Sequence, residues 1–220
     1  MRFAAIIFDF DGVIADSEVR ANTSLAESLT AIGMQTTYDE CLRDYYGHNW
    51  QETQRRIEAR FGRALPADFR ETHRARARAR FMDGFDAVPG ASAFLGTLES
   101  MPRAIASSSR AEYIDWALGL FGLGHHFGRH VYSADGWERG KPYPDIYLAA
   151  AQGLAVDPAR CMAIEDSPTG AQAALAAGMT VVGFCGAGHI ADRTAHGEML
   201  RNVGVHNVAM TFGEIERLTT

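Results

Sequence analysis

Lysine is almost absent from this chain. The sequence has 21 basic residues of the lysine and arginine type, and Lys141 is the only lysine among them. A lysine presents a compact ammonium group, which acts as a point charge against anionic oxygens in a way that arginine does not. Lys141 stands in the motif GKPYPD, where turn prolines restrict the backbone. We therefore expect this lysine to serve a function.

Cysteines and long apolar runs are also scarce. The three cysteines, Cys41, Cys161 and Cys185, are far apart and form no CxxC pair, which argues against a disulfide framework or a zinc site. We expect them to be packing residues. The N-terminal apolar run is cut short by Asp9, so no signal peptide is predicted, and no stretch approaches the roughly 20 residues that span a bilayer. These absences favour a cytoplasmic protein without a membrane partner.

A broad excess of positive charge is missing as well. The net charge is −6 over 220 residues, so no nucleic-acid partner is expected. The one basic run, HRARARAR, reads as a solvated helix. The length allows one large domain, or a core domain with a smaller insert.

Short apolar runs alternate with helical stretches over most of the chain. The expected strands are Phe3–Phe8, Arg103–Ala106, His130–Ser133, Cys161–Ile164, Thr180–Phe184 and Val205–Met210. The expected helices between them are Ala91–Glu99, Ala111–Leu120, Asp145–Gln152 and Pro168–Ala177. Continuous apolar runs are typical of strands buried on both faces, and their alternation with helices predicts an α/β fold with a Rossmann-like parallel sheet.

Residues 14–81 interrupt this alternation. The segment shows four helical patterns, at Ser17–Ile32, Tyr38–Tyr46, Trp50–Phe61 and Asp68–Phe81. We predict a core domain of residues 1–14 and 83–220, with a helical bundle of residues 15–82 inserted after the first strand.

Polar side chains follow several predicted strands. They are Asp9, Asp11, Ser107, Ser108, Ser109, Glu165 and Asp166. Ligands of parallel sheets bind beyond the carboxyl ends of the strands, so these groups should meet at one edge. Close carboxylates repel one another unless a cation lies among them, and oxygen ligands favour Mg²⁺.

Four segments together resemble the haloacid dehalogenase-like superfamily. They are DFDGV (Asp9–Val13), the serine Ser107, GKPYPD (Gly140–Asp145) and IEDSPTG (Ile164–Gly170), and they occur in the order of the four family motifs. The insert resembles the α-helical cap of one subfamily. Within that subfamily, the chain looks most like the sugar-phosphate phosphatases and β-phosphoglucomutases.

The resemblance implies a mechanism. Asp9 would attack phosphorus and form an aspartyl-phosphate, while Asp11 would act as general acid and then as general base. Ser107 and Lys141 would hold the transferring phosphoryl oxygens. The implied Mg²⁺ ligands are Asp9, Asp11 through its backbone carbonyl, Glu165 directly or through water, and Asp166.

The resemblance also implies contacts with the substrate. The predicted contacts are Gly12, Glu18, His48 and Ser108, with Asn22, Arg43, Asn49 and Trp50 as further candidates. The alternative for Trp50 is a place in the core of the helical bundle, and the alternative for His48 is a surface loop residue without a role in the site.

Three positions bear on the reaction. Asp11 favours phosphate esters over haloacids, because a halide leaving group needs no proton. Mutases of this family carry a histidine where this chain has Ala21, and an asparagine where it has Ala111. The sequence therefore predicts a phosphatase: Mg²⁺-dependent hydrolysis of a small phosphorylated metabolite, with a sugar phosphate favoured. The alternative is a β-phosphoglucomutase-like hexose-phosphate mutase.

Two other classes of protein fit less well. A signalling receiver domain also uses aspartates, Mg²⁺ and a lysine, but it is phosphorylated on a later strand and has no cap. A catalytically silent binding protein would not need the whole set of Asp9, Asp11, Ser107, Lys141 and Asp166. The oligomeric state is left open.

Overall fold

The computed structural model describes residues 3–46, 48, 50–82, 84–98, 100–133 and 135–219. The chain divides into two compact units, Met1–Asp16 with Asp86–Thr220, and Ser17–Phe85. The boundaries predicted from the sequence, after residues 14 and 82, lie close to this division, although Asp83 itself is outside the described residues. That the helical unit serves as a cap stays a prediction.

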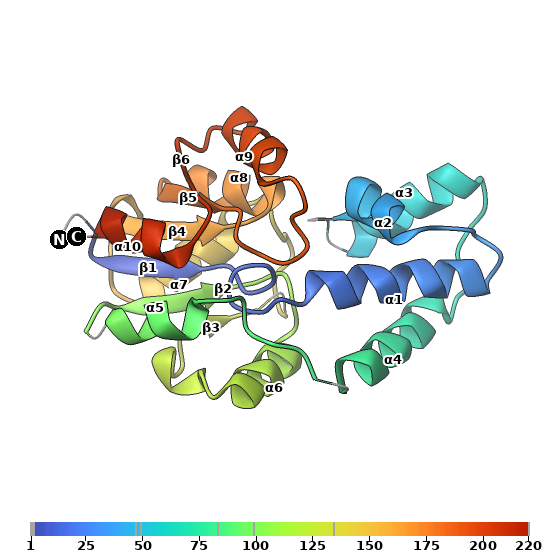
Figure 1. Ribbon diagram of the computed structural model, residues 1–220, viewed down its shortest axis with the longest axis horizontal. Coiled ribbons are helices and arrows are strands. Elements are labelled where there is room, and N and C mark those ends of the chain that lie inside the picture. The colour runs from blue at the N-terminus through green and yellow to red at the C-terminus, as the bar shows by residue number, and fades with distance from the viewer. Residues whose placement is uncertain are drawn as a thin grey trace. The chain divides into compact units, whose positions relative to one another are not determined.

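The first unit is built on a parallel sheet of six strands in the order β3-β2-β1-β4-β5-β6 (Figure 1). The strands are β1 (Ala5–Phe8), β2 (Arg103–Ala106), β3 (Val131–Tyr132), β4 (Cys161–Glu165), β5 (Thr180–Phe184) and β6 (Asn207–Ala209). The central strands β1, β2 and β4 are buried along their whole length, as their apolar runs require. The predicted α/β fold with a parallel sheet is confirmed.

Helices complete this unit. They are α5 (Ala91–Thr97), α6 (Ala111–Phe121), α7 (Asp145–Gly153), α8 (Pro168–Ala176), α9 (Arg193–Asn202) and α10 (Phe212–Thr219), with short 3₁₀ turns η1 (Gly124–His126) and η2 (Pro158–Arg160). The N-terminus of α8 is capped by Ser167, which accepts a hydrogen bond from Gly170 and is followed by a proline. Helices α9 and α10 were not predicted from the sequence.

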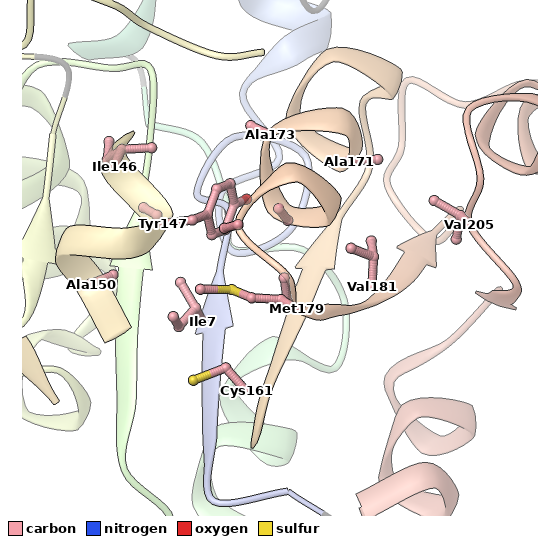
Figure 2. Packing of buried hydrophobic residues seen from close by; sticks show 14 of the residues in the cluster. Ile7, Ile146, Tyr147, Ala150, Cys161, Ala171, Ala173, Met179, Val181 and Val205 are labelled. Carbon is pink, nitrogen blue, oxygen red and sulfur yellow. The ribbon is translucent and has the colours of Figure 1, made fainter. Parts of the chain in front are cut away.

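Alternate strand residues face opposite layers of this unit. Ala5 and Ile7 of β1 join a cluster with residues of α7 and α8, including the fully buried Tyr147 (Figure 2). Phe8 points the other way, and its ring lies 6.1 Å from that of Phe94 in α5. Aromatic contacts continue from Phe94 to α10 at 5.2 Å. The sheet is thus covered on both faces, which leaves its strand ends as the place where polar groups can gather.

The second unit is a bundle of helices. They are α1 (Glu18–Ala31), α2 (Tyr38–Tyr45), α3 (Trp50–Phe61) and α4 (Phe69–Met82). Thr37 and Glu40 form a capping box at the start of α2. The unit has its own apolar core, which contains Leu29, Ile57 and Phe69.

The chain leaves the first unit and returns to it at adjacent points. The amide of Asp16 donates to the carbonyl of Asp86 at 3.1 Å, and the amide of Val88 donates to that of Ile14 at 2.8 Å. The helical unit is therefore an insertion between β1 and α5. In the part of the chain that the structure describes, no helix combines the length and the apolar character needed to cross a bilayer.

Candidate active site

The site is assembled at the carboxyl ends of β1 and β4. These strands pair in parallel, with Phe8 opposite Ile164, and the amide of Asp9 donates to the carbonyl of Ile164 at 2.9 Å. The first residues after β1 therefore face the last residues of β4. Asp9 and Glu165, which are 156 positions apart in the sequence, are brought together with Asp166 by this register.

Lys141 bridges two carboxylates of the site. Its Nζ atom lies 2.7 Å from Oδ1 of Asp9 and 2.6 Å from Oε1 of Glu165. The lysine side chain is 6% exposed, and the Glu165 side chain is fully buried. An ammonium group buried this deeply is stable only beside opposite charge, so the lone lysine of the chain is matched by these two acids.

Glu165 is surrounded by donors. Besides Lys141, the hydroxyl of Tyr147 donates to its Oε1 at 2.7 Å, and the hydroxyl of Ser167 donates to its Oε2 at 3.1 Å. A Cβ atom on Gly170 would lie 1.8 Å from Oε1, so only glycine fits beside this carboxylate. These contacts hold the Glu165 side chain in one place and orient Lys141 toward Asp9.

The electrostatics of Asp9 and Lys141 differ from those of exposed groups. Burial, and next the charge of Glu165, raise the pKa of Asp9 to about 8, although Lys141 acts in the opposite direction. Burial alone would lower the pKa of Lys141, but the charges of Asp9 and Glu165 raise it above its usual value. The lysine is therefore charged, whereas Asp9 needs further positive charge nearby to be fully ionised at neutral pH.

Three carboxylates meet closely enough to share a metal ion. Among the described residues, Asp9, Glu165 and Asp166 each offer an oxygen within 4.8 Å of the others, and all three are buried. When ionised, they face one ammonium group, which leaves two formal negative charges. An all-oxygen site with this charge fits a hard divalent cation such as Mg²⁺.

Gly12 makes room for Asp166. Its φ of +80° is a left-handed conformation that favours glycine, and a Cβ atom there would lie 1.7 Å from Oδ2 of Asp166. The glycine of the DFDGV motif thus lets the chain turn beside the acid.

Two buried histidines lie next to Asp166. Nε2 of His196, in α9, donates to the backbone carbonyl of Asp166 at 2.5 Å. Nε2 of His189 lies 3.6 Å from Oδ2 of the same residue. Burial lowers the pKa of both histidines, that of His189 to about 3, so both are neutral at physiological pH. The loop that carries His189 is fastened by the amide of Gly188, which donates to Asp16 at 3.1 Å.

The side chain of Asp11 is not part of this group. Its Oδ2 accepts a hydrogen bond from the hydroxyl of Ser109 at 2.6 Å, and its Oδ1 accepts one from the hydroxyl of Tyr113 at 3.1 Å. The two aspartates of DFDGV are thus held by different neighbours, which is the separation that two different chemical roles require.

The serines that follow β2 differ in exposure. Ser107 is buried, and its hydroxyl oxygen accepts a hydrogen bond from the amide of Ser109 at 3.0 Å. Ser108 is exposed. The structure therefore places Ser107 beside the Asp11 loop through Ser109, while Ser108 is free to face solvent.

The predicted contacts in the helical unit stay predictions. Glu18 accepts a hydrogen bond from Asn22 within α1 at 2.7 Å, and burial lowers the pKa of His48. Asn49 lies outside the described residues. Trp50 stacks on Phe69 with ring centroids 6.2 Å apart, which is the packing role that the sequence left open for it.

Several residues of the site were missed by the sequence analysis. They are Tyr113, Tyr147, Ser167, His189 and His196. A tyrosine within the apolar pattern IYLAAA was the available signal for Tyr147, because a buried hydroxyl needs a partner.

Comparison with known proteins agrees with this geometry. The model of the family described as haloacid dehalogenase-like hydrolase matches residues 3–178. The fructose-1-phosphate phosphatase of Escherichia coli strain K12 is 30% identical over 181 residues, which cover 82% of this chain and 96% of that protein.

Solved structures show the same fold. A conserved haloacid dehalogenase-like protein of unknown function from Agrobacterium tumefaciens strain C58 has a TM-score of 0.88 and 32% identity, covering 99% of this chain and 97% of that one. A hydrolase from Deinococcus radiodurans R1, crystallised with bound phosphate and sodium, has a TM-score of 0.80 and 32% identity, covering 99% and 95%.

These matches confirm the resemblance and the enzyme class predicted from the four motifs, a hydrolase whose relatives are phosphatases. The match spans the β1 acids, Lys141 and the β4 acids that the structure brings together. The chain belongs to the haloacid dehalogenase-like hydrolase family.

Proposed function

We propose that this protein hydrolyses a small phosphate monoester, with a sugar phosphate as the favoured substrate, in a Mg²⁺-dependent reaction through an aspartyl-phosphate. The observation that carries the proposal is the contact of Lys141 with Asp9, which places a buried cation at 2.7 Å from the expected nucleophile. The sugar phosphate rests on the similarity to the fructose-1-phosphate phosphatase of Escherichia coli.

In the first half of the reaction, an oxygen of Asp9 attacks phosphorus and the bond from phosphorus to the ester oxygen breaks. Asp11 gives a proton to that leaving oxygen, so the alcohol departs neutral. Lys141 contributes positive charge beside Asp9 as the phosphoryl group arrives.

In the second half, Asp11 takes a proton from water, and the water oxygen attacks phosphorus. The bond from phosphorus to Asp9 breaks, so that inorganic phosphate leaves and the carboxylate is regenerated. Asp9, Asp166 and Glu165 would hold the Mg²⁺, with the backbone carbonyl of Asp11 as a further ligand. The ion would supply positive charge against the phosphoryl oxygens.

The test is a phosphate-release screen over sugar phosphates, polyol phosphates and other small monoesters, with Mg²⁺ and with a chelator. We expect release from a subset of esters, its loss in the chelator, and its loss in Asp9→Asn. Equal rates for Asp9→Asn and the unchanged protein would remove Asp9 from the proposed role, and activity in full chelation would remove the cation.

The mutase alternative is tested in the same assay. Ala21 and Ala111 stand where mutases of this family carry a histidine and an asparagine, which favours hydrolysis. Steady release of phosphate without an added sugar bisphosphate would support the phosphatase, whereas transfer that depends on such a bisphosphate would favour the mutase.

A further inference from the structure

The carboxylate of Asp11 is held by two hydroxyl groups from the segment between β2 and α6. Ser109 donates to Oδ2 at 2.6 Å and Tyr113 donates to Oδ1 at 3.1 Å. We infer that Tyr113 is a positioning residue for Asp11, one that keeps this carboxyl group aligned for proton transfer. The inference rests on the proposed function, in which Asp11 is the general acid and base.

The ring of Tyr113 is itself fixed. It packs edge-on against Phe10, with centroids 5.9 Å apart and an interplanar angle of 84°. Phe10 is fully buried and lies between the two aspartates in the sequence. This aromatic contact holds the ring, so the tyrosine hydroxyl keeps its place relative to Asp11 in the segment that follows β1.

The start of α6 is anchored too. Asp135 accepts a hydrogen bond from the amide of Ala111 at 2.9 Å, at the first turn of the helix that carries Tyr113. This contact ties the helix to the end of β3, so the hydroxyl of Tyr113 reaches Asp11 from a supported backbone.

A hydroxyl suits a group that changes its protonation state. It donates to an ionised carboxylate, and it can accept from a protonated carboxyl group, whereas a lysine or arginine can only donate. Tyr113 can thus stay paired with Asp11 after the proton has moved to the leaving oxygen and after one has been taken from water. A cation at this position would favour the ionised form alone.

The experiment compares two kinds of ester in Tyr113→Phe, which keeps the ring and removes only the hydroxyl. An alkyl phosphate needs a proton on its leaving oxygen, whereas p-nitrophenyl phosphate releases a stable phenolate that does not. In single-turnover measurements we expect the rate of alkyl ester cleavage to fall about tenfold, equivalent to about 1.4 kcal/mol. The rate for the aryl ester should change less than twofold, and KM from separate steady-state measurements should be nearly unchanged for both.

A double-variant cycle identifies the partner of Tyr113. In Asp11→Asn, where no proton can be transferred by residue 11, adding Tyr113→Phe should cause no further loss with the alkyl ester, on which Tyr113→Phe alone costs about tenfold. Ser109→Ala provides a second variant that removes the other hydroxyl. It should likewise slow alkyl ester cleavage more than aryl ester cleavage.

Trp116→Phe is the matched control. Trp116 lies on the same helix with its ring 6.3 Å from that of Tyr113, and it has no hydroxyl at Asp11. We expect equal, small effects on both esters.

The positioning role would be overturned if Tyr113→Phe slowed both esters equally, or if it caused a further loss in the Asp11→Asn background. Neither result would contradict the proposed phosphatase activity. A protein that releases no phosphate from any ester would overturn the proposed function, and the inference with it, because Asp11 would then have no proton to transfer.

Discussion

Gly12 and Asp166 share a space that cannot hold a side chain on both residues. The α carbon of Gly12 faces the carboxylate so closely that a Cβ atom would lie 1.7 Å from Oδ2 of Asp166. Gly12→Ala should therefore displace the acid and strain a backbone whose φ is +80°. We expect loss of Mg²⁺-induced thermal stabilisation and of activity, together with a loss of about 1–2 kcal/mol in stability from the backbone conformation.

Gly178→Ala is the matched control for Gly12→Ala. Gly178 has a φ of +82° with no neighbouring atom within 4 Å of the added Cβ, so it incurs the conformational cost without the collision. It should lose similar stability from the backbone and keep its response to Mg²⁺. If Gly12→Ala responded to Mg²⁺ as well as Gly178→Ala does, the proposed metal role of Asp166 would be wrong.

Removing the charge of Lys141 should destabilise the protein when no cation is bound. Lys141→Met leaves Asp9 and Glu165 buried without their ammonium partner, at a cost of about 3–5 kcal/mol. Denaturant unfolding in a chelator measures this loss, and Mg²⁺ should restore more stability to the variant than to the unchanged protein. Arg139→Met removes an exposed pair with Asp145 and should cost less than about 1 kcal/mol. A loss no larger than that of the control would show that Lys141 is not needed to balance the acids.

The stability of the cation-free protein should depend on pH through Asp9. Its pKa is raised from 3.8 to about 8 in the folded protein, first by burial and then by Glu165, so the folded state holds a proton that the unfolded state has released. The stabilising contribution is complete below pH 3.8 and is lost as pH rises toward 8, by at most about 1.4 kcal/mol per pH unit.

The measurement for Asp9 is denaturant unfolding in a chelator at pH 5 and pH 8, with Asp9→Asn beside the unchanged protein. Asparagine does not titrate. The unchanged protein should therefore lose stability relative to Asp9→Asn when the pH is raised from 5 to 8. Mg²⁺ should reverse this trend, since the cation binds the ionised carboxylate and releases the proton. Two parallel pH curves would contradict the assignment.

His196 should influence cation affinity without touching the cation. Its Nε2 donates to the backbone carbonyl of Asp166 at 2.5 Å, and loss of such a supporting contact typically weakens metal binding by about 10–100-fold. Titration calorimetry of His196→Phe with Mg²⁺ tests this expectation. His206→Phe changes an exposed histidine and should leave the affinity unchanged. Equal affinities in both variants would mean that the turn carrying Asp166 is held without His196.

Much of the fold could be predicted because its signals are local. Strand β2 spans the predicted Arg103–Ala106, and α3 spans the predicted Trp50–Phe61. The elements that were missed have weaker signals. Helix α9 is mostly polar and depends on the cap of Asp192, which accepts from the amides of Thr194 and Ala195. Helix α10 depends on Phe212, which packs against Phe94 from a distant part of the chain.

The sequence by itself determined the chemical inventory of this protein: the acids of DFDGV, the lone lysine and the acids after the fourth strand, each identifiable from a short motif. Only the tertiary structure decided which of them meet. Asp11 is held by Tyr113, and Glu165 by Tyr147, because helix positions and strand register bring those hydroxyls to the same sheet edge. A hydrogen bond between residues far apart in sequence leaves no local pattern, so such partners are set by packing alone.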